Sequence, residues 1–483
     1  MFDLRPVAYV IGLLVATLGA TMFLPMLVDI AEGRGEWHVF LETGLVSMLT
    51  GGLIALACAN GVKEGLTLQQ TFLLTVGVWA ALPLFGGLPF IFGATEASFT
   101  DAYFEAMSGL TTTGSTVFSG LDTLPKGLLL WRGILQWLGG IGIIVLAVAI
   151  LPMLGIGGMQ LYRAEVPGPV KDNKLTPRIA ETAKALWYIY VGLTIACALA
   201  YWIAGMTLFD AIGHSFSTVA IGGFSTHDAS MGHFDSHAIK LIASFFLFLS
   251  GVNFALHFMA WNQRGPWHYF RDPEFRFYAG VMGGACVATV AILVLTATYD
   301  PWHSITNGIF QVLSIATTAG FTSADFHYWP SVLPVMLILM AFMGGCGNST
   351  AGGMKAMRIL LIYRQGAREI RRILHPNAVI PIKLGHRPVS DRILQAVWGF
   401  FSMYMVVFVV LLLINLAMGL DQVTAWTAVV ATLTNLGPGL GEVSSTFQTM
   451  PDLTKWSGMA AMILGRLEIF TLLVLFTPEF WRR

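Results

Sequence analysis

The sequence predicts an all-α polytopic membrane protein with ten transmembrane helices. Of its 483 residues, 55% are hydrophobic and only 11% are charged, whereas soluble domains carry about 25% charged residues. Ten apolar runs are long enough to cross a bilayer, which takes about 20 residues. A motif that recurs four times between these runs predicts that the later spans form repeats. The hydrophobicity excludes a disordered chain, and 27 basic against 27 acidic residues provide no excess of positive charge for binding nucleic acid.

The apolar runs divide the chain into a regular series of spans. They lie near residues 7–30, 39–61, 69–93, 128–158, 183–207, 239–262, 276–299, 331–354, 394–419 and 456–480. The first run is kept as a helix because it is too long for the apolar region of a signal peptide and lacks a cleavage pattern.

Basic residues are distributed unevenly between the two sides of these spans. With both termini on the cytoplasmic side, the inner segments hold 21 of the 27 basic residues and the outer segments hold five. Because cytoplasmic loops are enriched in Lys and Arg, both termini are expected in the cytoplasm, and a bacterial inner (plasma) membrane is the expected location. The remaining basic residue, Arg466, falls in the middle of the last apolar run.

A short semi-polar segment separates two spans at four places, and the four segments align without gaps. They run from Asp101 to Gly114, from Asp210 to Gly223, from Asn307 to Gly320 and from Thr424 to Gly437. Each begins with a residue type that caps helices, thirteen residues before the glycine. We therefore divide the chain into two leading helices (1–66), repeat 1 (67–162), repeat 2 (163–265), repeat 3 with a basic cytoplasmic arm (266–375) and repeat 4 (376–483).

Each segment is expected to form a helix of about ten residues that enters the membrane halfway, followed by a glycine-containing stretch that returns to the same side. Non-helical backbone at membrane depth is tolerated where it is buried or lines a water-filled path. Four such pore loops can surround one ion pore, with backbone carbonyls replacing the water around a dehydrated cation and glycine allowing the unusual torsions. Four coincidental glycine-rich loops are the alternative. The candidate filter residues are Thr111, Thr112, Thr113, Gly114, Ala220, Ile221, Gly222, Gly223, Thr317, Thr318, Ala319, Gly320, Thr434, Asn435, Leu436 and Gly437.

The motifs TTTGSTVFSG, TVAIGGFSTHD, ATTAGFTSAD and LTNLGPGLGEV, together with GGCGNSTAGGMK and GRLEIF, resemble the Trk/Ktr/HKT superfamily of cation transporters. The resemblance covers the whole chain and is greatest to the TrkH branch of potassium-uptake proteins. It implies one potassium-binding filter from the four pore loops, since glycine occupies the key position of all four repeats, as in potassium-selective members. Potassium is then the bound ion, and no organic cofactor is expected. The fourth repeat departs from the others at Asn435 and Pro438.

Two features qualify as gate elements. Gly344, Gly345, Gly347, Gly352 and Gly353 crowd one apolar run around Asn348 and Ser349, and glycine costs about 1 kcal/mol relative to alanine inside a helix. This span is therefore expected to be broken, and the resemblance implies an obstructing intramembrane loop here; a packing kink is the alternative. Arg466 should face the cavity or a partner, because arginine in lipid is costly. Either it tunes cation passage beneath the filter or it donates hydrogen bonds to pore-loop carbonyls.

The inner arm between Lys355 and Arg392 carries Arg364, Arg368 and Arg372 at helical spacing. This pattern fits anchoring beside anionic lipid or docking of a soluble regulator. The resemblance implies a cytosolic nucleotide-binding regulatory subunit of the TrkA type and a homodimer. The chain itself shows no P-loop and no dinucleotide fingerprint.

Other features point to no additional chemistry. The four cysteines (Cys58, Cys197, Cys286 and Cys346) lie far apart in apolar runs and are expected to be packing residues. The outer loop after the second filter holds His227, Asp228, His233, Asp235 and His237; a solvated loop is favoured over a metal site. Catalytic motifs are lacking, so no enzyme is expected. A proton- or sodium-coupled symporter using the same filter is the main alternative, and an intramembrane enzyme or receptor is a distant one.

Overall fold

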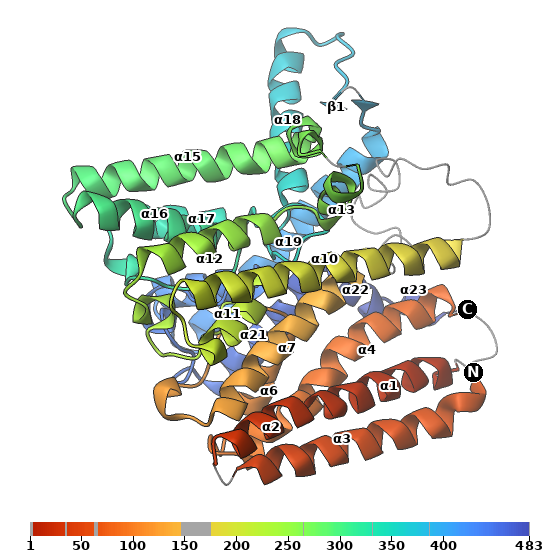
Figure 1. The fold of residues 1–483 in the computed structure, drawn as a ribbon. Helices are drawn as coiled ribbons and strands as arrows, with labels where there is room; N and C mark the ends of the chain where they lie inside the picture. Colours follow the sequence, from red (N-terminus) through yellow and green to blue (C-terminus); the bar gives the residue numbers. More distant parts are fainter. Residues whose placement is uncertain are drawn as a thin grey trace.

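The computed structural model of the chain describes residues 3–33, 36–61, 66–145, 175–263, 265–330, 332–385 and 387–482. This part of the chain is almost entirely helical (Figure 1), so the predicted all-α class is confirmed. Its β-structure is one two-residue antiparallel hairpin, in which β1 (Lys383–Leu384) pairs with β2 (Arg387–Pro388).

The two leading apolar runs form a tight pair of antiparallel helices. They comprise α1 (Arg5–Thr21), its continuation α2 (Phe23–Ala31), α3 (Trp37–Cys58) and the single turn η1 (Ala59–Gly61). A side chain on Gly12 would collide with the carbonyl of Gly51, and one on Gly19 would collide with the carbonyl of Gly44. Small residues therefore let the two backbones touch, as is common between helices in membranes.

The remaining chain repeats one order of elements four times: a long helix, a short helix, an irregular return segment and a further helix. The first unit contains α4 (Leu68–Gly86), α5 (Leu88–Phe92), α6 (Phe99–Leu110), η2 (Leu121–Thr123) and α7 (Lys126–Val145). The second contains α10 (Leu175–Ile203), α11 (Leu208–Ala220), η4 (Ser230–His233), α12 (His237–Ser250) and α13 (Phe254–Asn262).

The third unit contains α14 (Trp267–Arg271), α15 (Pro273–Leu295), α16 (Pro301–Ala316), η5 (Phe326–Tyr328), α17 (Leu333–Met340) and α18 (Ala356–Leu374). The fourth contains α19 (Asp391–Ala417), α20 (Gln422–Leu433), η6 (Gly441–Val443), α21 (Asp452–Arg466), α22 (Phe470–Leu473), η7 (Val474–Phe476) and α23 (Pro478–Trp481). In Figure 1, α18 projects away from the body of the protein, next to the β-hairpin.

Six continuous segments in the described residues are long and apolar enough to cross a membrane: Arg5–Ala31, Trp37–Cys58, Leu68–Phe92, Ala183–Ile203, Pro273–Leu295 and Asp391–Ala417. Two further helix pairs qualify together but are bent, α12 with α13 by 91° and α21 with Phe470–Phe476 by 108°. The count of ten crossings thus stays a prediction. The predicted span at 128–158 runs past the described residues, and the one at 331–354 is helical only in α17.

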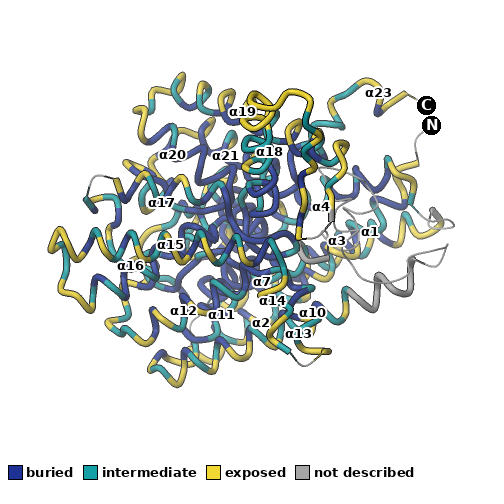
Figure 2. Tube along the Cα trace, turned by 90° about the horizontal axis from the view of Figure 1, so that it is seen from above, coloured by how far each residue is buried: buried dark blue, intermediate teal, exposed yellow. Residues whose placement is uncertain are grey.

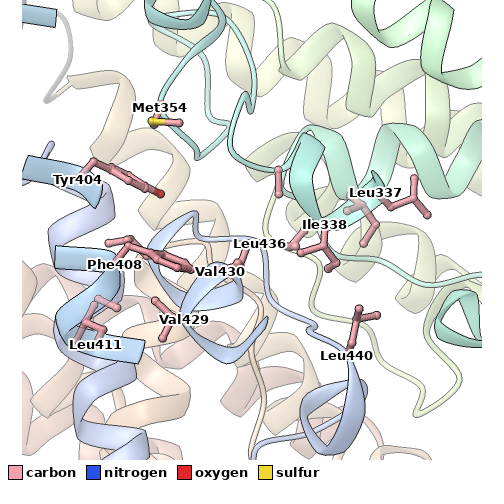
Figure 3. Packing of buried hydrophobic residues seen from close by; sticks show 14 of the residues in the cluster. Leu337, Ile338, Met354, Tyr404, Phe408, Leu411, Val429, Val430, Leu436 and Leu440 are labelled. Carbon is pink, nitrogen blue, oxygen red and sulfur yellow. The ribbon is translucent and has the colours of Figure 1, made fainter. Parts of the chain in front are cut away.

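The centre of the molecule is buried, and the exposed residues lie around it (Figure 2). One large apolar cluster joins α17, α19 and α20. Figure 3 shows Leu436 and Val430 facing Phe408, with Met354 above Tyr404. Since lipid is as apolar as these side chains, their packing stabilises the fold mainly through van der Waals contact. The cluster holds the fourth return segment against its neighbouring helices.

Candidate functional site

The four short helices α6, α11, α16 and α20 are capped by side chains that lie earlier in the sequence than the predicted caps. The capping residues are Ser98, Thr207, Asp300 and Asp421, whose side chains accept hydrogen bonds from backbone N–H groups of the first turn. The prediction that Asp101, Asp210, Asn307 and Thr424 cap the helices is therefore wrong. Asp101 and Asp210 instead occupy the third helical position, where each accepts a hydrogen bond from the hydroxyl of its cap. The helices have 12, 13, 16 and 12 residues, slightly longer than expected.

After each helix, the backbone alternates between right- and left-handed torsions in the same way. The key glycine and the residue two before it have positive φ in all four repeats: Thr112 and Gly114, Ile221 and Gly223, Thr318 and Gly320, and Asn435 and Gly437. Alternation of this kind turns successive N–H groups to one side of the strand, and the carbonyls to the other.

The N–H groups point back to the helix that precedes them. In repeat 1, Thr111, Thr112 and Thr113 donate to the carbonyls of Met107, Gly109 and Ser108 at 2.8, 2.9 and 2.8 Å. The last of these bonds recurs in all four repeats at 2.8 Å, from Thr113, Gly222, Ala319 and Leu436 to Ser108, Ser217, Ser314 and Ala431. Three of the four repeats have serine at the accepting position, but the acceptor is the backbone carbonyl. Alanine can therefore take the place of serine at residue 431.

The four return segments touch one another in a closed ring. A Cβ atom on each key glycine would collide with the backbone carbonyl that precedes the key glycine of the next repeat. The pairs are Gly114 with Gly222, Gly223 with Ala319, Gly320 with Leu436, and Gly437 with Thr113. The last pair closes the ring, with the added atom 2.8 Å from the Thr113 oxygen. All sixteen predicted filter residues therefore lie together around one axis, although they are spread over more than 300 residues.

Side chains that sequence reasoning missed brace the ring from behind. Gln136 of α7 donates to the Gly222 carbonyl at 2.6 Å and accepts from the Phe224 N–H at 3.1 Å. Arg132, one turn earlier, pairs with Glu105 at 2.8 Å and is 1% exposed in its side chain. Its guanidinium also donates to the Ser225 carbonyl at 2.9 Å and lies 4.2 Å from the centre of the Phe224 ring. Repeats 1 and 2 are thereby joined.

Glu105 has polar counterparts at the same helix position in the next two repeats. His214 lies 2.9 Å from the Ser225 hydroxyl, and Gln311 accepts from the Ser323 N–H at 3.2 Å. In repeat 4, Thr427 accepts from the Leu440 N–H at 2.9 Å and so performs the same role one position earlier. A charged or polar residue inside an apolar run is the signal that could have identified these braces.

A vestibule of about 290 Å³ opens on one side of the ring. Its lining includes the four key glycines Gly114, Gly223, Gly320 and Gly437. Arg132, His227, Asp228, Asp325 and His327 also contribute to the wall. The vestibule therefore connects directly with the ring at the level of its glycines.

The opposite side of the ring is covered by the irregular segment between α17 and α18. The helix stops at Met340 and resumes at Ala356, so this predicted span is broken. Gly352 donates its N–H to the Thr318 hydroxyl at 2.6 Å, and Gly353 donates to the Thr434 carbonyl at 2.9 Å. Gly352 has no room for a side chain, because a Cβ would collide with the Thr434 carbonyl.

Arg466 ends α21 beside the same segment. Its Nε donates to the Thr111 carbonyl at 2.7 Å, and its terminal nitrogens contact Thr112 and the Thr350 carbonyl, the latter at 3.3 Å. The predicted hydrogen bond to a carbonyl of a return segment is thus present, directly beneath the ring. Glu468 does not pair with Arg466; it binds Arg358 at 2.6 Å.

The broken segment is anchored by one carboxylate. Glu274 of α15 accepts from the N–H groups of Gly347 and Met357 at 2.8 and 3.1 Å. The Asn348 carbonyl accepts from Phe254 at 3.1 Å, and the Ser349 hydroxyl donates to the Cys346 carbonyl at 2.5 Å. The segment is therefore a defined structure with its own hydrogen bonds, and it can pack against the ring as a unit.

The outer His/Asp residues separate into two places. His227 and His233 stack face to face, with ring centres 3.5 Å apart, whereas His237 lies near Thr306 and His303. The His233 and His237 pair suggested by their spacing is thus not formed. Asp122, from the loop after the first filter, accepts from His227 at 2.5 Å, and this hydrogen bond lowers the pKa of the Asp122 carboxyl.

Comparison with known proteins gives consistent matches over the whole chain. Residues 37–483 match the TrkH family, described as cation transport proteins. The chain is 54% identical to a protein of Halomonas elongata named Trk system potassium uptake protein TrkH, covering all of both chains. It is 53% identical to the protein of the same name from Escherichia coli K12 over 99% of each chain. The crystal structure of the potassium transporter TrkH from Vibrio parahaemolyticus matches with a TM-score of 0.93 at 49% identity, covering all of both chains.

Proposed function

Because the chain belongs to the TrkH family of cation transport proteins, we propose that it mediates potassium uptake through the ring of four return segments. The observation that carries this proposal is the closure of the ring: each repeat contacts the next, and the fourth contacts the first. A single chain thereby surrounds one axis with four backbones of the same conformation.

The chemistry of the ring suits a cation without its water. Most N–H groups of the segments are hydrogen-bonded to the preceding helices, so the carbonyl oxygens that no neighbouring group binds are the groups that remain to face an ion. The four short helices end at the ring, and their C-terminal dipoles add negative potential. Carbonyl oxygens on such a backbone are the ligands by which potassium pores replace hydration water.

In the conformation described, the broken segment and Arg466 close the path beneath the ring. Hydrogen bonds to Thr318, Thr434 and Thr111 hold them against the filter, and the arginine adds a fixed positive charge. Opening requires these contacts to break together, so Gly344, Gly345, Gly347, Asn348, Ser349, Gly352, Gly353 and Arg466 form the gate. Hydrogen bonds to charged groups contribute about 1.5–3 kcal/mol each, which makes the Arg466 contacts the strongest part of the closure.

Control from the cytoplasm would act through α18. This helix begins at Ala356, directly after the gate segment, and carries Arg364, Arg368 and Arg372. Exposed apolar side chains accompany them, including Tyr363 at 69% and Ile373 at 78% exposure. A basic and partly apolar helix suits docking of a cytosolic nucleotide-binding subunit of the TrkA type. The chain would then work in the inner membrane with both termini in the cytoplasm, as a homodimer.

Growth of cells that lack potassium uptake tests this function. Expression of the chain should restore growth on low potassium, and co-expression of the regulatory subunit should change the uptake rate. Replacing Arg364, Arg368 and Arg372 by glutamate should abolish the effect of the subunit while leaving the protein in the membrane. Failure of the wild-type chain to restore growth, at normal expression, would contradict potassium uptake.

A further inference from the structure

The outer loops of repeats 1 and 2 bring three metal-ligating side chains together beside the vestibule. Ligand atoms of Asp122, His227 and His233 all lie within 4.8 Å of one another. Asp122 belongs to η2, which follows the first filter, and the two histidines belong to the loop and turn that follow the second. The cluster therefore depends on the fold, because 105 residues separate Asp122 from His227.

The two ring nitrogens of His227 have different surroundings. His227 Nδ1 donates to Asp122 at 2.5 Å, while His227 Nε2 is buried and makes no hydrogen bond in the described part of the chain. That nitrogen faces a second carboxylate, Asp210, at 3.4 Å. Two carboxylates thus converge on one imidazole, and a divalent cation would neutralise their charge.

The two histidine rings lie side by side in parallel planes. Their planes differ by 2° and their centres are 3.5 Å apart. A metal lies in the plane of each imidazole that binds it, so one of the two parallel rings must rotate to share the ion. The exposed side chain of His233 has room for this rotation.

We propose that Asp122, His227 and His233 form a binding site for a divalent transition metal, of which Zn²⁺ is the best fit, at the outer edge of the vestibule. Two imidazoles and one carboxylate suit Zn²⁺, which accepts three protein ligands and a water molecule in tetrahedral geometry. Mg²⁺ and Ca²⁺ prefer oxygen ligands alone. The metal would take the place of the proton at His227 Nδ1, and the ring proton would move to Nε2, which faces the Asp210 carboxylate at 3.4 Å.

Such a metal would act on the filter in two ways. It would tie the loop of repeat 1 to the loop of repeat 2, and it would place positive charge beside His227, which lines the vestibule above the ring. Both effects slow the entry of potassium. This consequence rests on the proposed function, whereas the binding of the metal does not.

Calorimetric titration of the purified full-length protein with Zn²⁺ tests the site. The wild-type chain should bind one Zn²⁺ at micromolar free metal, and Mg²⁺ should not compete. His233→Ala and Asp122→Asn should each weaken binding by at least about tenfold, since even outer-shell changes at metal sites cost 10–100-fold. His327→Ala is the matched control, because His327 lines the same vestibule outside the cluster, and it should bind as the wild type does.

Two results would overturn the site: no binding to the wild-type chain at micromolar Zn²⁺, or equal binding by a folded His233→Ala variant, in which an exposed side chain is removed. Potassium uptake with and without Zn²⁺ then tests the consequence. Zn²⁺ should slow uptake by the wild type and by His327→Ala but not by His233→Ala. Because calorimetry needs no transport, loss of the proposed function and loss of the site would give different results.

Discussion

Replacement of Gly114 by serine should change the ion preference of the filter. Gly114 has φ = +84°, and an added Cβ would collide with the Gly222 carbonyl. That carbonyl cannot simply move away, because Gln136 holds it at 2.6 Å. A left-handed torsion costs a residue with a side chain about 1–2 kcal/mol. If the preference of the ring for K⁺ over Na⁺ falls by the same ~1–2 kcal/mol, the ratio of K⁺ binding to Na⁺ binding falls by a factor of about 5–30.

The assay is uptake of K⁺ and Na⁺ by proteoliposomes or by cells without other potassium transporters, after size-exclusion chromatography has shown that the variant is folded. Gly283→Ser is the matched control, since Gly283 of α15 has no atom within 4 Å of an added Cβ and no positive φ. It should keep the wild-type ratio. A folded Gly114→Ser variant with wild-type uptake and an unchanged ratio of K⁺ to Na⁺ would refute the role of the ring.

Three further predictions concern the braces and the gate. Gln136→Ala should lower K⁺ selectivity in the same uptake assay, because the Gly222 carbonyl loses its donor; a ratio equal to that of the wild type would exclude a bracing role. Arg132→Met should reduce the free energy of unfolding by about 3–5 kcal/mol, since Glu105 is left as a buried charge; denaturant titration in detergent measures this, and a change below about 1 kcal/mol would contradict the pairing. Arg466→Ala should raise potassium flux in the absence of the regulatory subunit, and unchanged transport across a potassium titration would rule out its gate role.

The four segments of the ring could be located from the sequence because their conformation is a property of the backbone. Where positive φ coincides with close contact to the next strand, only glycine fits, and this requirement leaves a mark in the sequence. At Gly114 and Gly223 the requirement is twofold, because positive φ and collision with the next strand both exclude a side chain. The break after Met340 was predictable for the same reason, since several glycines in one apolar run disfavour a helix.

The starts of the short helices could not be placed correctly. Repeat 1 offers two residues of a type that caps helices, Ser98 and Asp101, and repeat 2 offers Thr207 and Asp210. The alignment of the four segments favoured the second residue of each pair as the cap. The structure uses the earlier residue as the cap and the later one as its partner. In repeat 3, the signal was Asp300 followed by proline at the first helical position, a combination typical of helix starts.

The braces behind the filter were missed because they link distant parts of the chain. Glu105 and Arg132 are 27 residues apart, and Gln136 and Gly222 are 86 residues apart. No helical or strand periodicity relates these positions. From the sequence, Arg132 is only one of the five basic residues of the outer segments; its pairing with Glu105 follows from the way that α6 and α7 pack.

Binding of Rb⁺ or Tl⁺, which replace K⁺ and scatter strongly, gives the most direct test of the ring as an ion filter. The account predicts anomalous density on the axis surrounded by residues 111–114, 220–223, 317–320 and 434–437, and its loss in Gly114→Ser. Density at another place in the protein, with none on this axis, would contradict it.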